Sequence, residues 1–223
     1  MSIGVPTVSG PPPLPITTQQ WATYIDFNEA WQALQMDSAP VGVQATRLQR
    51  LIDSACATAQ RGANRPFCPT QFQERHDGWG GSEIQLDYTP VLQLASCREW
   101  ESSGGWVPLP ESTPESPVEG VQVNYATGRL VRTFAGYSWP RPFFPGSRNV
   151  EVTYLAGFNP VPADVWDATM DLVAYKWRMT MEAPRWWQAS ADEYGGGASD
   201  PLYPGVPNRI AEVFSAYRVP GVA

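Results

Sequence analysis

At 223 residues, with 43% hydrophobic and 17% charged residues, the chain has the composition of a globular protein able to bury a core. Its formal net charge of −7 argues against a protein that grips duplex DNA by its phosphates, because such binding needs clustered cations. No apolar run approaches the ~18 residues that span a bilayer, so no membrane partner is expected.

The N-terminal residues 1–16 contain closely spaced prolines, including Pro11, Pro12 and Pro13. This spacing predicts a flexible, extended arm of polyproline type. Two interpretations stay open: a disordered tail, or an arm that becomes ordered on a neighbouring subunit. No basic residue precedes Arg47, so the start lacks the charged region of a secretory signal.

Two helices are predicted after the arm. Asp26 followed by Glu29 forms a capping-box pattern and predicts a short helix from Phe27 to Gln35. Apolar residues at helical spacing then predict a longer helix from about Val41 to Arg61, with Gly62 placed to cap its end.

Between Phe67 and Thr153 the apolar period changes to two, which is typical of strands. Clean alternation over Glu83–Tyr88 predicts one strand. Val91, Leu92, Leu94 and Ala95 lead into a second predicted strand that ends near Glu101, and Ser102–Gly105 predicts a hairpin turn. Further strands flank a turn at Ala126–Gly128. The pattern predicts an antiparallel β module inserted between two helical segments.

A strand, a turn and a long helix follow one another within Val150–Met181. Alternation predicts the strand, and Pro162 stands where the first turn of a helix tolerates proline. Apolar residues at helical spacing begin at Val165. A final short helix is predicted over Pro207–Arg218.

These elements predict a mixed α+β fold, a small helical bundle with an inserted antiparallel β module and long loops. The predicted parts are a flexible proline-rich arm (1–16), an N-terminal helical part (17–66), the inserted β module (67–158), and C-terminal helices (159–223) with a long loop at 183–206.

Six sequence pieces, in order, resemble the head–tail connector (adaptor) proteins of long-tailed double-stranded DNA phages. They are the helix around Arg47–Ala55 leading to Asn64–Phe67, a polar strand ending at His76–Gly78, Ile84–Val91, Tyr125–Leu130, the strand–turn–helix of Tyr154–Asp164, and Val206–Ile210 with Tyr217–Arg218. The proline-rich start and the Trp186–Trp187 loop depart from this pattern, so partner contacts there do not carry over.

The resemblance implies a structural virion protein without catalytic residues. Such proteins form a homo-oligomeric ring, twelvefold by the resemblance, in the neck between capsid and tail after synthesis in the host cytoplasm. The ring binds the portal, presents a surface to the next neck or tail protein, and extends the channel through which double-stranded DNA passes without specific binding. Another neck or tail-completion protein is the nearest alternative.

Candidate interface residues fall in an interval rich in arginine and aromatic residues and in the C-terminal part. An acidic segment, Glu74–Glu119, with nine acids and two arginines, could supply the partner on a neighbouring subunit. Plain core packing and single-strand binding by stacking are the other interpretations of the arginine interval. The candidates are Arg129, Arg132, Trp139, Arg141, Phe143, Phe144, Trp186, Trp187, Tyr203, Tyr217 and Arg218.

Asp164, Asp167 and Asp171 recur at helical spacing away from the apolar stripe of the long helix. A solvated acidic face is one interpretation. A stripe that faces the channel lumen and repels DNA is a second, and a divalent-metal nuclease site a third.

The remaining residues favour no catalytic, cofactor or metal site. His76 is the single histidine and is predicted to lie at a strand end and turn, which leaves a hydrolase without a nucleophile motif. The three cysteines form no Cys-x-x-Cys pair and are predicted to be reduced thiols. The ten tryptophans and the β module leave a carbohydrate-binding module as a rival from another class.

Overall fold

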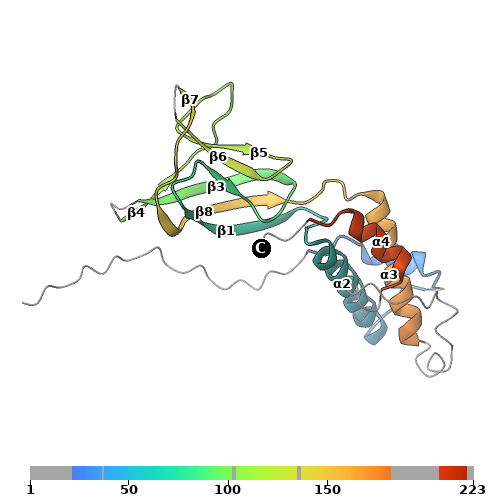
Figure 1. Ribbon diagram of the computed structural model, residues 1–223. Coiled ribbons are helices and arrows are strands. Elements are labelled where there is room, and N and C mark those ends of the chain that lie inside the picture. The colour runs from blue at the N-terminus through green and yellow to red at the C-terminus, as the bar shows by residue number, and fades with distance from the viewer. Residues whose placement is uncertain (1–21, 37, 102–103, 135–136, 182–205, 220–223) are drawn as a thin grey trace, which may run out of the picture. The chain divides into compact units, whose positions relative to one another are not determined.

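The structure, a computed structural model, describes residues 22–36, 38–101, 104–134, 137–181 and 206–219 (Figure 1). These residues form two compact units. The β unit comprises the described residues of 71–156, and the helical unit comprises those of 22–70 and 157–219. The mixed α+β class expected from the sequence is confirmed.

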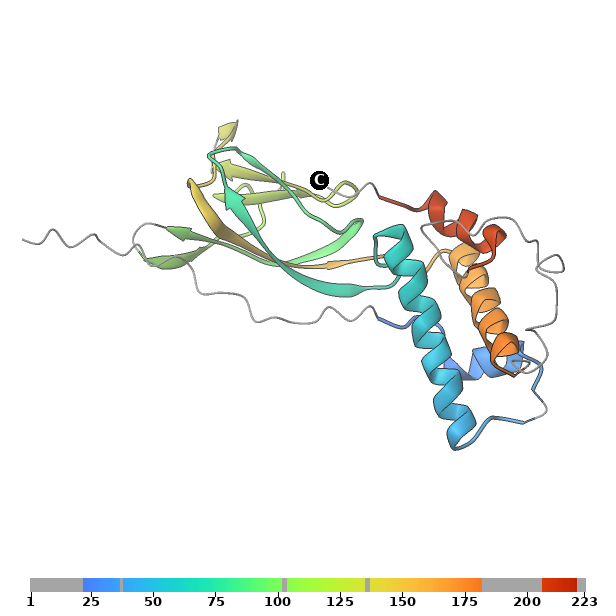
Figure 2. The ribbon, with the colours of Figure 1, turned by 60° about the horizontal axis from the view of Figure 1, so that its bottom comes forward.

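Four helices make up the described part of the helical unit: α1 (Phe27–Ala33), α2 (Val43–Ala63), α3 (Ala163–Met181) and α4 (Asn208–Ala216). Within this unit α2 runs beside α3, and α4 packs on both (Figure 2). Leu48 and Ile52 of α2 meet Leu172 of α3 and Phe214 of α4 in one apolar core. The apolar stripes of the helices therefore face one another, as amphipathic helices require.

The predicted helix boundaries are right to within a few residues, and one predicted cap is wrong. The side chain of Asp26 caps α1 by accepting hydrogen bonds from the backbone N–H groups of Asn28 (2.7 Å) and Glu29 (3.3 Å). Gly62 lies inside α2 and does not cap it. Asn64 ends the helix instead, in the left-handed conformation (φ 51°), which asparagine tolerates better than most residues.

The β unit contains two antiparallel layers (Figure 1). One sheet has the order β1-β8-β3-β4 and the other the order β2-β6-β5, with β7 also pairing with β6. The strands are β1 (Thr70–Gly78), β2 (Glu83–Gln85), β3 (Val91–Glu101), β4 (Gly105–Pro108), β5 (Gly120–Asn124), β6 (Arg129–Phe134), β7 (Tyr137–Pro140) and β8 (Gly146–Ala156).

Alternation along β8 fixes which face of its sheet is buried. Val150, Val152, Tyr154 and Ala156 are all buried and point to one face, as the period of two requires. The pairing of β8 with β3 sets the register of the two strands, and in it Cys97 of β3 lies opposite Val152 of β8.

The strand predicted over Glu83–Tyr88 is longer than the observed β2, which ends at Gln85. Tyr88 leaves the ladder because its N–H donates to the hydroxyl of Tyr154 (3.1 Å) and its ring stacks on Phe72 (4.2 Å between centroids). The apolar alternation therefore reports the burial of Ile84 and Leu86 and the packing of the half-buried Tyr88, although the strand has ended at Gln85.

Candidate interface surfaces

The arginines predicted to reach a neighbouring subunit are paired within the β unit. Arg129 pairs with Glu83, and Arg141 pairs with Glu119. Both acids belong to the acidic segment Glu74–Glu119 of the same chain. The arginine interval was predicted to meet the acidic segment of a neighbouring subunit, and in the structure it meets the acidic segment of its own chain.

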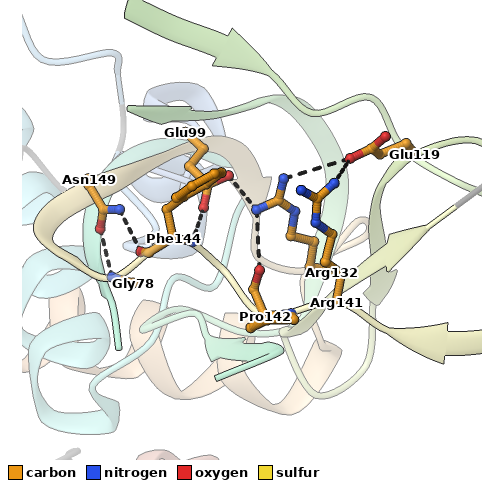
Figure 3. Close-up of polar contacts among 8 residues, drawn as sticks. All are labelled: Gly78, Glu99, Glu119, Arg132, Arg141, Pro142, Phe144 and Asn149. Atoms are coloured by element: carbon orange, nitrogen blue, oxygen red, sulfur yellow. Dashed lines mark hydrogen bonds and ion pairs between the residues drawn. The ribbon is translucent and has the colours of Figure 1, made fainter. Parts of the chain in front are cut away.

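Arg132 forms the buried centre of this network (Figure 3). Its side chain is 2% exposed, and its guanidinium donates to the carboxylate of Glu99, which is fully buried, and to the carbonyl of Pro142 (3.3 Å). The other oxygen of Glu99 accepts the N–H of Phe144 at 2.6 Å. Burial raises the pKa of the Glu99 carboxyl, while the Phe144 N–H and Arg132 favour its charged form.

Hydrogen bonds continue from this centre to the end of β1. The side chain of Asn149 donates to the carbonyl of Phe144 (2.8 Å) and accepts the N–H of Gly78 (2.7 Å), as Figure 3 shows. A Cβ on Gly78 would lie 2.0 Å from the Phe144 carbonyl oxygen, so only glycine fits there. Buried groups thus hold the turn after β1 against the segment before β8.

That turn displays Trp79, whose exposed fraction is 85%. Sequence reasoning missed this residue among ten tryptophans. Its signal was local, because Trp79 follows a strand and lies between Gly78 and the pair Gly80–Gly81. Glycines on both sides of an indole are typical of a turn and not of a core strand.

The other predicted interface residues fall in different environments. Phe143 is buried in the β unit, and Phe144 is half-buried. Tyr217 and Arg218 follow α4, and Trp139 belongs to β7, although its side chain is not among those described. Trp186, Trp187 and Tyr203, with the predicted arm and most of the predicted 183–206 loop, lie outside the described residues.

Two of the three predicted lumen-facing acids of α3 have partners in the helical unit. Asp164 accepts the hydroxyl of Tyr217 at 2.9 Å, and Asp171 pairs with Arg209 of α4 at 3.0 Å. Asp167 is exposed. The acids therefore lie on the surface of α3, where two of them also tether the α4 region.

A second charged cluster lies on the β1-β8-β3-β4 sheet. Glu151, buried in β8, accepts hydrogen bonds from Arg75 (2.7 Å) and Arg98 (2.7 Å). Both guanidinium groups also lie over the ring of Trp106, at 5.2 and 4.7 Å from its centroid. Burial opposes ionisation of Glu151, but the two arginines lower its pKa overall.

The single histidine and the three cysteines all lie in the described part of the chain. His76 lies within β1, not in the turn after it, and contacts Glu74 at 2.9 Å; Glu74 in turn accepts the hydroxyl of Tyr154. Cys56, Cys68 and Cys97 are free and buried. Among the described residues no group of three or more potential ligands could hold a metal ion, and no helix could span a membrane.

No protein-family model and no curated protein sequence matches the chain. Solved structures do match. A chain in the neck of an empty gene transfer agent (GTA) particle, computed with C6 symmetry, shares 18% identity with a TM-score of 0.58, covering 93% of this chain and 95% of that chain. A chain in the virion of a native GTA particle gives the same values.

A chain in the neck of a native GTA particle computed with C12 symmetry matches at 17% identity and a TM-score of 0.51, covering 79% of this chain and 84% of that one. At such identities the likeness establishes a shared fold over nearly the whole chain. It agrees with the resemblance to head–tail connector proteins.

Proposed function

We propose that this protein is a structural subunit of the neck of a phage-like particle, where copies form a connector ring between portal and tail. The observation that carries the proposal is the shared fold with GTA neck chains, which extends over 93% of this chain and 95% of the neighbour. A match of that extent includes the elements of both units in the same order along the chain, and it is therefore larger than one common structural motif.

The symmetry of the neighbouring structures supports a ring. Their necks were computed with C6 and C12 symmetry. A cyclic ring uses heterologous contacts, in which one surface patch of a subunit meets a different patch of the next. The chain would act by geometry alone: it continues the DNA channel below the portal and offers a platform to the next neck or tail protein.

The acidic face of α3 supports a passive channel. Asp164, Asp167 and Asp171 are all exposed. Negative charge facing the lumen would repel the DNA backbone and let the duplex pass without sticking.

Native mass spectrometry of the chain, alone and mixed with the portal protein of the same genome, tests the proposal. A stoichiometric ring-on-ring complex is expected, even where the chain alone remains a monomer. A folded chain that does not bind portal would contradict the connector role and favour another neck or tail component.

The pair Trp186 and Trp187 provides a further prediction. Replacing both by alanine is expected to leave the monomer folded and to weaken assembly, because large aromatics dominate binding energy at interfaces. Circular dichroism checks the fold, and native mass spectrometry checks assembly. Loss of the folded monomer would assign both indoles to the core instead.

A further inference from the structure

Three apolar side chains of the described chain are far more exposed than the rest. Trp79 in the β unit is 85% exposed, while Val41 and Val43 in the helical unit are 80% and 84% exposed. An indole left in water forfeits the burial of roughly 150–250 Å² of surface. Because tryptophan is enriched at the buried centres of interfaces, Trp79 on one unit and the valine pair on the other are the candidate contact patches.

The Trp79 patch is built as a rigid anchor. Gly78 is held by Asn149, and the carbonyl of Gly81 accepts the N–H of Phe143 at 2.8 Å. Gly80 takes a positive φ of 76°, which permits the tight turn between them. Because both ends of the turn are fixed to buried residues, docking the indole costs little ordering entropy.

The second patch, the α2 corner, consists of Val41, Val43 and Arg47. Gly42 lies between the valines, and a Cβ there would meet nothing within 4 Å. Arg47 is one turn beyond Val43 on the same exposed face, and its guanidinium is held by the carbonyl of Thr180 at 3.1 Å. Aliphatic side chains beside a positioned guanidinium suit an indole, through burial and cation–π attraction.

We propose that Trp79 of one copy packs on the α2 corner of the neighbouring copy. The inference rests on the proposed function, because a cyclic ring needs two different patches on each chain. Trp79 and the α2 corner are two such patches of matching chemistry. The contact repeats around the ring and leaves no unsatisfied Trp79 or α2 corner once the ring closes.

Cysteine cross-linking tests the contact directly. Both cysteines stand beside the contact, so that Trp79 and Val43 remain in place. A chain carrying Gly81→Cys, where a Cβ meets nothing within 4 Å, is mixed with a chain carrying Gln44→Cys at an exposed position of α2. The mixture is treated with a short bismaleimide, with and without the portal protein. The native cysteines are buried and do not compete. An 81–44 cross-link identified by mass spectrometry is expected. Pairing Gly81→Cys with Glu212→Cys, an exposed position on α4, should lower the yield at least tenfold.

Each outcome decides one of the two proposals. Ring-on-portal complexes without the 81–44 link, or a link formed equally with Glu212→Cys, would overturn the Trp79 contact and leave the connector role standing. An 81–44 link in concentrated chain that never binds portal would retain the contact and overturn the connector role. Neither link nor complex would overturn both.

Two variants separate assembly from folding. Trp79→Ala is expected to weaken assembly ~30-fold, the effect of removing an interface hot spot. Val43→Glu places an acid in the first turn of α2, one turn before Arg47, which should stabilise the isolated helix. The same variant should weaken assembly, since it removes half of the apolar corner. Unchanged assembly of both variants would refute the contact.

Discussion

Of the two described units, one buries charged side chains. In the β unit the buried polar residues are the charged Arg132, Glu99 and Glu151 and the neutral Thr89, Ser112 and Asn149. In the described helical unit they are Gln60 and Thr169, both neutral. Burying a charge is costly unless it is paired and hydrogen-bonded, so the β unit depends on particular partners. The helical unit depends mainly on filling its apolar volume.

The difference indicates what each unit is built to do. The β unit must hold loops in place, and the Glu99 and Asn149 hydrogen bonds fix the segment before β8 and the turn that displays Trp79. Paired charges have directional geometry and can select one loop conformation. The helical unit presents helix faces, which need close packing more than exact partners.

Replacing Arg132 by methionine should have the largest effect on stability, because it leaves the Glu99 carboxylate buried without its ion-pair partner. We expect a loss of about 3–5 kcal/mol in the free energy of unfolding of the β unit. Urea denaturation with hydrogen exchange of β-unit amides measures it. The double variant with Glu99→Leu should recover much of the loss, and equal stability of single and double variants would contradict the account.

Leu172→Ala probes the apolar core of the helical unit, where this side chain is fully buried. A loss of about 3 kcal/mol is expected from the lost burial and the cavity left behind. Leu172→Met, which conserves volume, should cost less than about 1.5 kcal/mol. Arg132→Lys should not be tolerated in the same way, because lysine cannot reproduce the guanidinium fork. If Arg132→Lys were tolerated as well as Leu172→Met, the proposed difference between the two units would be wrong.

Glu151 makes the β unit sensitive to acid. Its folded pKa lies below the ordinary value of about 4.3, so the ionised form stabilises the fold above that pH. This contribution is lost as the pH falls through the folded pKa. Glu151→Gln should cost about 2 kcal/mol at pH 7 and flatten the acid limb of the stability curve.

Thermal melts of wild type and Glu151→Gln between pH 3 and pH 7 measure this dependence. Glu115→Gln, at an exposed position, is the matched control and should leave the curve unchanged. If stability still falls with decreasing pH in Glu151→Gln as it does in the wild type, other carboxylates cause the sensitivity to acid.

Asp26→Ala should have the smallest effect, about 1 kcal/mol in the helical unit, because it removes the side chain that caps α1. Asp26→Asn keeps an acceptor oxygen and should cost less. Chemical denaturation of both variants provides the test. An alanine variant as stable as wild type would mean that water satisfies the end of α1 equally well.

Local pattern was sufficient for the secondary structure and the α+β class. Local pattern predicted a strand that ends near Glu101, where β3 ends, and identified the capping side chain of Asp26 from its neighbours along the chain. The prediction of Gly62 as the cap of α2 was wrong because Asn64, two residues further on, also tolerates the left-handed conformation, and local pattern does not rank the two residues. The predicted end of β2 was wrong because Tyr88 can pack on Phe72 without the hydrogen bonds of a strand.

What the sequence determined by itself is therefore the part governed by neighbours along the chain: periodicity, caps, turns, and the order of elements that resembles connector proteins. Only the tertiary structure decided that Arg132 is buried against Glu99 and that Asn149 holds the turn that displays Trp79. Both contacts join residues that are far apart in the chain, 33 residues between Arg132 and Glu99 and 71 residues between Gly78 and Asn149. Burial is a property of the folded packing, and composition around a residue does not reveal which side of a sheet will be covered.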